Sequence, residues 1–167
     1  MAVATLTGLA PLVSPATRVL ILGSFPGVRS LQTQQYYGHP QNHFWRILQA
    51  VWPSGPYEIS VSSYENRSEW LLERGLGVWD VYASCEREGS LDSAIRNAVP
   101  NDIAALHLPQ LQAIAHNGGE SFKHARHTRT LGVAVYQLPS TSPANASWSF
   151  ERKLAAWREV MERHGLV

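Results

Sequence analysis

The sequence predicts an α/β fold: a single three-layer α/β/α domain with a central, mostly parallel, four-stranded sheet. Short apolar runs end in polar or turn residues, and helical patterns lie between them. Such alternation implies parallel strands with helices covering both faces of the sheet. The chain of 167 residues is long enough to bury one core, so we expect residues 1–167 to form one domain.

The predicted elements follow one another along the chain. Ser68 is expected as the N-cap of the second helix and Gly75 as its C-terminal stop. The last helix shows apolar residues at helical spacing from Phe150 to Met161. Pro53–Ser63 has no pattern and is interpreted as a surface excursion. The predicted strands are Arg18–Gly23, Gly77–Tyr82, Leu111–Asn117 and Leu131–Leu138, and the other predicted helices are Asn42–Trp52, Ser68–Arg74, Asp92–Asn97, Asn101–Leu106 and Gly119–Thr128.

The amino-acid composition limits the classes of protein to which this chain can belong. The formal net charge of +1 neither demands nor forbids a nucleic-acid partner. The single cysteine, Cys85, excludes an internal disulfide framework and a cluster held by several thiolates. No apolar run approaches the roughly 20 residues that span a membrane. Met1–Ala16 lacks the basic start of a signal peptide, so a cytoplasmic protein without membrane contact is expected.

The first predicted strand ends in the turn Gly23-Ser-Phe-Pro-Gly27. Its glycines are too few for a dinucleotide fingerprint, and no Lys-Ser/Thr pair follows for a phosphate loop. One interpretation is a simple tight turn. The other is a ligand site, because glycines let the backbone approach a ligand closely and because such sites lie at the carboxyl ends of parallel strands.

The following loop is rich in tyrosine and amides, which suits a flat, polar, uncharged ring. Tyr36 and Tyr37 either cover an edge of the core or provide a ring that stacks on a planar base. If Pro40 is the first helical position, Asn42 lies in the first helical turn; otherwise Asn42 is itself the N-cap. Asp80 ends an apolar strand, where it either caps a loop or reads a base edge.

Other polar segments are open to two interpretations. The pairs His39/His43 and His124/His127 lack nearby carboxylates or thiolates, so no metal site is expected. Leu138–Ala146 is either a turn or a segment whose hydroxyls hold DNA phosphates. The basic run Lys123–Arg129 is either a solvated helix face or a phosphate contact.

Taken in order, these segments resemble the uracil-DNA glycosylase superfamily, and most closely its hypoxanthine-DNA (deoxyinosine) glycosylase branch, often called family six. The resemblance extends from Leu9 through the final helix. Two of its segments also resemble those of mismatch-specific uracil- and thymine-DNA glycosylases. The segments that carry it are Val19–Gly27, Gln35–Trp45, Gly77–Val81, Gly89–Ser93 and Leu138–Ser142.

The resemblance implies a role for each matching residue. The mismatch enzymes place a water-positioning asparagine where this chain has Phe25, and the branch it resembles uses one farther along, which matches Asn42. Tyr37 falls where the superfamily stacks a ring on the flipped base, and Asp80 near a base-reading asparagine. The first motif contributes Gly23 and Ser24 to the base site. The expected DNA contacts are Ser140, Thr141, Ser142, Asn145 and Lys123.

The resemblance therefore implies a monofunctional glycosylase that needs no cofactor. It would release a deaminated base, chiefly hypoxanthine, from double-stranded or single-stranded DNA, as a monomer associated with the nucleoid. One alternative is a uracil- or mismatch-specific thymine glycosylase of the same fold, although Phe25 leans against strong uracil activity. The other is a non-catalytic DNA-binding module, which would need no Asn42.

Overall fold

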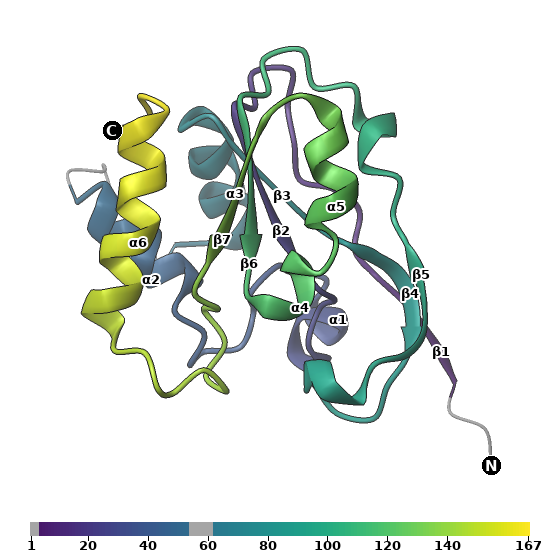
Figure 1. Ribbon diagram of the computed structural model, residues 1–167. Coiled ribbons are helices and arrows are strands. Elements are labelled where there is room, and N and C mark those ends of the chain that lie inside the picture. The colour runs from purple at the N-terminus through teal and green to yellow at the C-terminus, as the bar shows by residue number, and fades with distance from the viewer. Residues whose placement is uncertain (1–3, 54–61) are drawn as a thin grey trace.

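The computed structural model describes residues 4–53 and 62–167, and its centre is a parallel sheet (Figure 1). The strands are hydrogen-bonded in the order β3-β2-β6-β7, and every neighbouring pair is parallel. The predicted strands are thus confirmed: three begin one to three residues later than expected, and the strand expected over Gly77–Tyr82 runs from Leu76 to Asp80. The bounds are β2 (Val19–Gly23), β3 (Leu76–Asp80), β6 (Ala113–Asn117) and β7 (Ala134–Leu138).

Alternation along β2 directs side chains into two separate cores. Val19 and Ile21 belong to one buried cluster, and Leu20 and Leu22 to the other, because successive residues of a strand point to opposite faces. The first cluster includes Trp157, which has no solvent exposure. The helices that cover this face are α2 (Phe44–Val51), α3 (Tyr64–Glu73) and α6 (Phe150–Arg163).

The opposite face of the parallel sheet is covered partly by short helices and partly by a second sheet. The predicted helix Gly119–Thr128 is two short helices, α4 (Gly119–Phe122) and α5 (Ala125–Thr128). A second sheet, antiparallel and in the order β1-β4-β5, completes this layer (Figure 1). Its strands were not predicted from the sequence. They are β1 (Thr5–Thr7), β4 (Tyr82–Glu86) and β5 (Arg96–Pro100).

Several predicted helices differ from the structure. The helix expected over Asp92–Asn97 is wrong: a 3-10 turn, η2 (Asp92–Ala94), leads directly into β5. The helix expected over Asn101–Leu106 is a 3-10 turn, η3 (Ile103–Leu106). A third 3-10 turn, η4 (Arg129–Leu131), follows α5. A short helix, α1 (Val28–Thr33), occupies what was expected to be loop.

The α3 helix begins earlier than expected. Its N-cap is Ser63, whose Oγ accepts a hydrogen bond from the Asn66 amide, so the prediction of Ser68 as the cap is wrong. Gly75 ends the helix with a φ of +83°, as predicted. The surface excursion expected over Pro53–Ser63 lies mostly outside the described residues. Within residues 4–53 and 62–167, no helix has the length and apolar character needed to cross a bilayer.

Candidate functional site

A cleft of about 1070 Å³ lies at the carboxyl ends of the parallel strands. In Figure 1 these ends point toward α1 and toward the loop that joins β7 to α6. Parallel strands place the segments that follow them at one edge of the sheet, where open α/β sheets bind ligands. The last residue of each strand lines the cleft: Gly23 of β2, Asp80 of β3, Asn117 of β6 and Leu138 of β7.

The cleft brings together the site residues predicted from the sequence, with one exception. Lys123 is not among the lining residues; it is exposed, and its Nζ lies 3.2 Å from Glu120 Oε1. The predicted residues that line the cleft are Gly23, Ser24, Phe25, Tyr37, Asn42, Asp80, Ser140, Thr141, Ser142 and Asn145.

The floor of the cleft leaves no room for a side chain at Gly23. A β carbon there would lie 2.5 Å from Asp80 Oδ1 and 3.2 Å from Tyr37 Oη. Next to it, Ser24 Oγ donates a hydrogen bond of 2.6 Å to Asp92 Oδ1. The backbone at Gly23 therefore lies so close to the side chains of Asp80 and Tyr37 that only a glycine fits there.

Asp80 is a buried carboxyl, 6% exposed, and its Oδ2 has no hydrogen-bond partner among the described residues. Burial and the nearby charge of Asp92 raise the pKa of Asp80 to about 7, while Arg87 acts in the opposite direction. A carboxyl that titrates near neutrality and lines the cleft can accept or donate a ligand hydrogen bond.

Tyr37 has an unusual backbone conformation, and two contacts hold its side chain. Its φ is +53°, a left-handed value that the surrounding contacts must maintain. Its ring stacks on Phe44 with the centroids 4.0 Å apart and the planes inclined by 18°. Its hydroxyl accepts a hydrogen bond from Asn117 Nδ2 at 3.1 Å. The ring is thus rigidly positioned at the wall of the cleft.

The other two aromatic candidates are mainly core residues. Tyr36 is 5% exposed, and its hydroxyl donates to the Ala10 carbonyl at 2.6 Å, as the core-edge interpretation of this residue expects. Phe25 is 6% exposed, and the Arg87 guanidinium lies 5.4 Å from the centre of its ring. Both also line the cleft, so parts of their surfaces face its interior.

Asn42 lies two residues before α2 and fits neither interpretation drawn from the sequence. Its Oδ1 accepts a hydrogen bond of 2.9 Å from the Phe44 amide, while His43 occupies the N-cap position. The helix starts at Phe44, so Pro40 is not its first residue. Asn42 Nδ2 has no hydrogen bond to the described protein atoms, and this amide group lies at the cleft.

Residues that the sequence interpretation missed hold these groups in place. Asn117 Nδ2 also donates to Thr141 Oγ1 at 3.1 Å, and its Oδ1 accepts from the Thr141 amide at 3.0 Å. Lys153, 1% exposed on α6, lies 3.3 Å from His43 Nδ1 and 3.5 Å from the Ser142 carbonyl. Asn117 thus links Tyr37 to the loop after β7, and Lys153 links that loop to His43 at the start of α2. The sequence offered only one signal for Asn117, its position at the end of a predicted strand.

The segment after β7 is a series of local turns. Ser140 Oγ accepts from the Ser142 amide at 3.1 Å, and Asn145 Nδ2 donates to the Ser140 carbonyl at 3.2 Å. These bonds fit the turn interpretation, and the same residues line the cleft. Across the part of the chain that the structure describes, no three His, Cys, Asp or Glu side chains are grouped as a metal site.

Comparison with known proteins defines the class of this fold and cleft. Residues 10–161 match the model of the uracil DNA glycosylase superfamily. The chain therefore belongs to the uracil DNA glycosylase superfamily, and it is a DNA glycosylase, a hydrolase of N-glycosyl bonds.

Two relatives and one solved structure resemble most of the chain. A hypoxanthine DNA glycosylase of Methanosarcina barkeri is 34% identical over 93% of this chain and 98% of its own length. One of Methanosarcina acetivorans is 36% identical over 89% and 92%. The solution NMR structure of a candidate uracil DNA glycosylase from M. acetivorans superposes with a TM-score of 0.85 at 32% identity, covering 96% of this chain and 99% of that one.

Proposed function

We propose that the protein removes hypoxanthine, the deaminated form of adenine, from DNA by hydrolysing its N-glycosidic bond. The observation that carries this proposal is the cleft, which gathers Asn42, Tyr37 and Asp80 at one edge of the sheet. The names and the near-complete coverage of the two Methanosarcina relatives support hypoxanthine as the base. The product is an abasic site, and no lyase step follows.

The target base must leave the double helix to reach the cleft. Flipping costs a few kcal/mol, and the cost is lower for a base that pairs poorly, as deaminated bases do. The flipped ring stacks on Tyr37, which Phe44 supports, and Phe25 contributes to the opposite surface. Stacking on an aromatic side chain is worth about 1–3 kcal/mol per base.

Asp80 distinguishes hypoxanthine from adenine. Hypoxanthine carries a ring N–H next to its carbonyl, whereas adenine has a bare ring nitrogen next to an amino group. The carboxylate of Asp80, which lines the cleft, accepts the ring N–H, and backbone groups of Gly23 and Ser24 lie beside it on the floor. A base that lacks this N–H leaves the buried carboxyl without its partner, which is unfavourable.

Asn42 orients the water that captures the sugar. Its Oδ1 is fixed by the Phe44 amide, so the carboxamide has one orientation and its Nδ2 is available to the water. An amide cannot take a proton at neutral pH, so catalysis depends on orientation and on electrostatic stabilisation of the cationic sugar. The phosphates of the DNA itself contribute negative charge.

The DNA backbone is held by the loop after β7 and by Lys123. Ser140, Ser142 and Asn145 have small side chains that fit close to a phosphate strand, whereas Thr141 is 1% exposed and holds the loop through its bonds to Asn117. One copy of the chain carries the whole cleft, so we propose a monomer that acts on double-stranded DNA and accepts single strands. Such an enzyme works beside the genome, in the cytoplasm and nucleoid of its cell.

The test uses duplexes that carry one inosine, uracil, xanthine or G·T mismatch, followed by alkali. Strand breaks are expected chiefly at inosine. Asn42→Ala should lower the rate by about a hundredfold because the water loses its orientation. Asn42→Ser is the matched control, because its hydroxyl still caps the Phe44 amide. It should keep the stability of the unmodified protein and still lose the activity.

Other outcomes would count against the proposal. Binding without breaks on any substrate would favour the non-catalytic module. Breaks chiefly at uracil would favour the uracil glycosylase of the same fold, which the structural neighbour makes the second candidate. Full activity in Asn42→Ala would assign the water to another residue.

A further inference from the structure

Lys153 is a buried lysine that has no acidic partner in the part of the chain that the structure describes. Its side chain is 1% exposed, and it belongs to neither of the ion pairs found there, which involve Lys123 and Arg163. Glu151, the acidic residue in the first turn of α6, is exposed. Removing a charge from water without a counter-ion is costly. The folded protein therefore carries an uncompensated positive charge at this position.

The place of Lys153 in the fold makes its charge still less favourable. Lys153 is the fourth residue of α6, close to the positive end of the helix dipole, which disfavours a cation. Its Nζ lies 3.3 Å from Nδ1 of His43, the N-cap residue of α2, so a second positive helix end is adjacent. An ammonium can only donate, so His43 accepts this hydrogen bond and supplies no negative charge. Burial lowers the pKa of Lys153. Burial and two helix ends thus all favour an anion near this lysine.

The loop after β7 connects Lys153 to the cleft. The Ser142 carbonyl is 3.5 Å from Lys153 Nζ, and Ser142 lines the cleft, whereas Lys153 does not. The Thr141 carbonyl accepts a hydrogen bond of 3.0 Å from the His43 amide. The starts of α2 and α6 therefore both hold this loop by its carbonyl groups.

Two hydroxyls of the same loop can donate to an anion. Ser140 Oγ accepts a hydrogen bond from the Ser142 amide at 3.1 Å, and Ser142 Oγ accepts one from the Ala144 amide at 3.1 Å. Neither hydroxyl donates to another residue within the described ranges, although each carries a proton. Both residues line the cleft. The bonds within the loop thus fix the two serine oxygens and leave two O–H donors next to a buried cation.

We propose that Lys153 is a positioning residue whose buried charge draws one phosphate of the target DNA strand onto Ser140 and Ser142. The phosphate accepts the two hydroxyl protons and supplies the negative charge that Lys153 lacks in the free protein. This inference deepens the proposed function, on which it rests, by naming the cation that fixes the strand beside the cleft. A feature that costs stability in the free protein, as this lysine does, is expected at a functional site.

The first measurement separates stability from DNA binding. Lys153→Gln removes the charge but keeps an N–H donor for His43. Its free energy of unfolding in urea should equal or exceed that of the unmodified protein, because the cost of burying the charge is gone. Its affinity for a duplex with 2′-fluoro-deoxyinosine, which resists hydrolysis, should fall about tenfold. Arg158→Gln is the matched control and should keep the affinity, because Arg158 lies on the same helix but donates to the Ala50 carbonyl near the far end of α2.

The second measurement identifies the phosphate. One neutral methylphosphonate replaces each phosphate near the modified nucleotide in turn. At one position the unmodified protein should lose about as much affinity as Lys153→Gln does, and the two changes together should cost no more than either alone. Single-turnover release of hypoxanthine at saturating protein should keep its rate in Lys153→Gln, because Lys153 does not line the cleft.

Each contrary result has a distinct meaning. Unchanged affinity in Lys153→Gln, or additive losses at every methylphosphonate position, would overturn the role of Lys153. A lower free energy of unfolding with equal weakening on all duplexes would make this lysine purely structural and would also overturn it. If the unmodified protein shows the expected binding pattern but releases no hypoxanthine, the proposed function fails while the role of Lys153 stands.

Discussion

At the scale of single residues, the carboxyl of Asp80 couples the stability of the fold to pH. Its pKa in the folded chain is about 7, above the ordinary aspartate value, because it is buried near Asp92. The folded state therefore binds this proton more tightly than the unfolded state does. The stabilisation is complete in acid, and it is lost as the pH rises from about 4 to about 7.

Asp80→Asn should remove this dependence. The variant should gain stability over the unmodified protein at about pH 8, by a few kcal/mol at most, and the gain should shrink toward about pH 4. Urea unfolding across this range measures it. Asp92→Asn is the control: it removes a negative charge that raises the Asp80 pKa, so the loss of stability should finish at a lower pH. Parallel profiles for Asp80→Asn and the unmodified protein would contradict this.

Residues that face the cleft were predictable because they lie at the carboxyl ends of the strands, as Gly23 and Asp80 do. Residues that support them were not. Asn117 acts on Tyr37, 80 positions away, and on Thr141, 24 positions away. The pattern of residues within one segment of the sequence does not indicate hydrogen bonds to residues so far along the chain. Arg87 was missed for the same reason, since its partner Pro26 is 61 positions away.

At the scale of elements, the start of α3 permits a direct comparison of two serines. Ser63 Oγ caps the Asn66 amide, whereas the buried Ser68 Oγ has no hydrogen-bond partner within the described ranges. Ser63→Ala should lower the free energy of unfolding by about 1 kcal/mol, because a helix-terminal amide loses its acceptor. Ser68→Ala should be neutral or slightly stabilising, because it removes an unpaired hydroxyl. Urea unfolding measures the free energy of unfolding of both variants. A larger loss of stability in Ser68→Ala than in Ser63→Ala would contradict Ser63 as the N-cap.

The two sheets differ in how far the sequence predicts them. Every residue of β2 and β6 is buried; β2 is a continuous apolar run, and β6 begins with one over residues 113–115. The strands of the second sheet are short and partly exposed, and β5 has no buried residue. Its residues pair with β4 through an irregular register. Strands of this kind form because they pair with a neighbouring strand, and their own sequence shows no alternation of buried and exposed residues. This explains why a helix was wrongly predicted over Asp92–Asn97.

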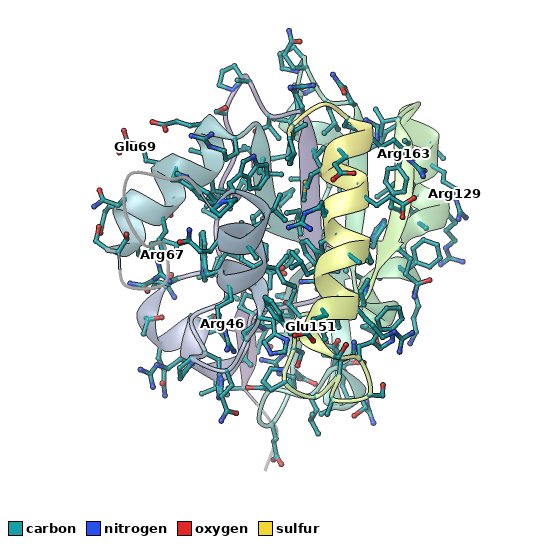
Figure 2. All side chains as sticks on the ribbon, turned by 90° about the vertical axis from the view of Figure 1, so that its left-hand side faces the viewer. Arg46, Arg67, Glu69, Arg129, Glu151 and Arg163 are labelled. Atoms are coloured by element: carbon teal, nitrogen blue, oxygen red, sulfur yellow. The ribbon has the colours of Figure 1, made fainter. Side chains whose placement is uncertain are left out.

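At the scale of the whole molecule, the cleft and the end of α6 lie at opposite ends of the sheet. Arg163 is at that far end (Figure 2), while Lys123 follows the cleft-lining Gly118 and Gly119 by a few residues. Both are exposed and paired with a glutamate on their own segment. They therefore form a matched pair for measuring which end binds DNA.

Lys123→Ala should weaken DNA binding and lower the slope of log K against log salt by about one, since one phosphate contact is lost. Arg163→Ala should leave both the affinity and the slope unchanged. Fluorescence anisotropy over a salt series measures the two variants. A slope that stays the same in Lys123→Ala would show that this lysine does not contact a phosphate.

The crowding at Gly23 limits the order in which this site can evolve. A β carbon at position 23 would lie 2.5 Å from Asp80 Oδ1. Alanine at position 23 is therefore harmful while aspartate occupies position 80, and becomes tolerable only after residue 80 has shortened. The effect of the substitution at position 23 thus depends on the residue at position 80. Of the two possible orders, the one that changes position 23 first is closed. A lineage that changes its base preference through position 80 thereby gains access to side chains at position 23.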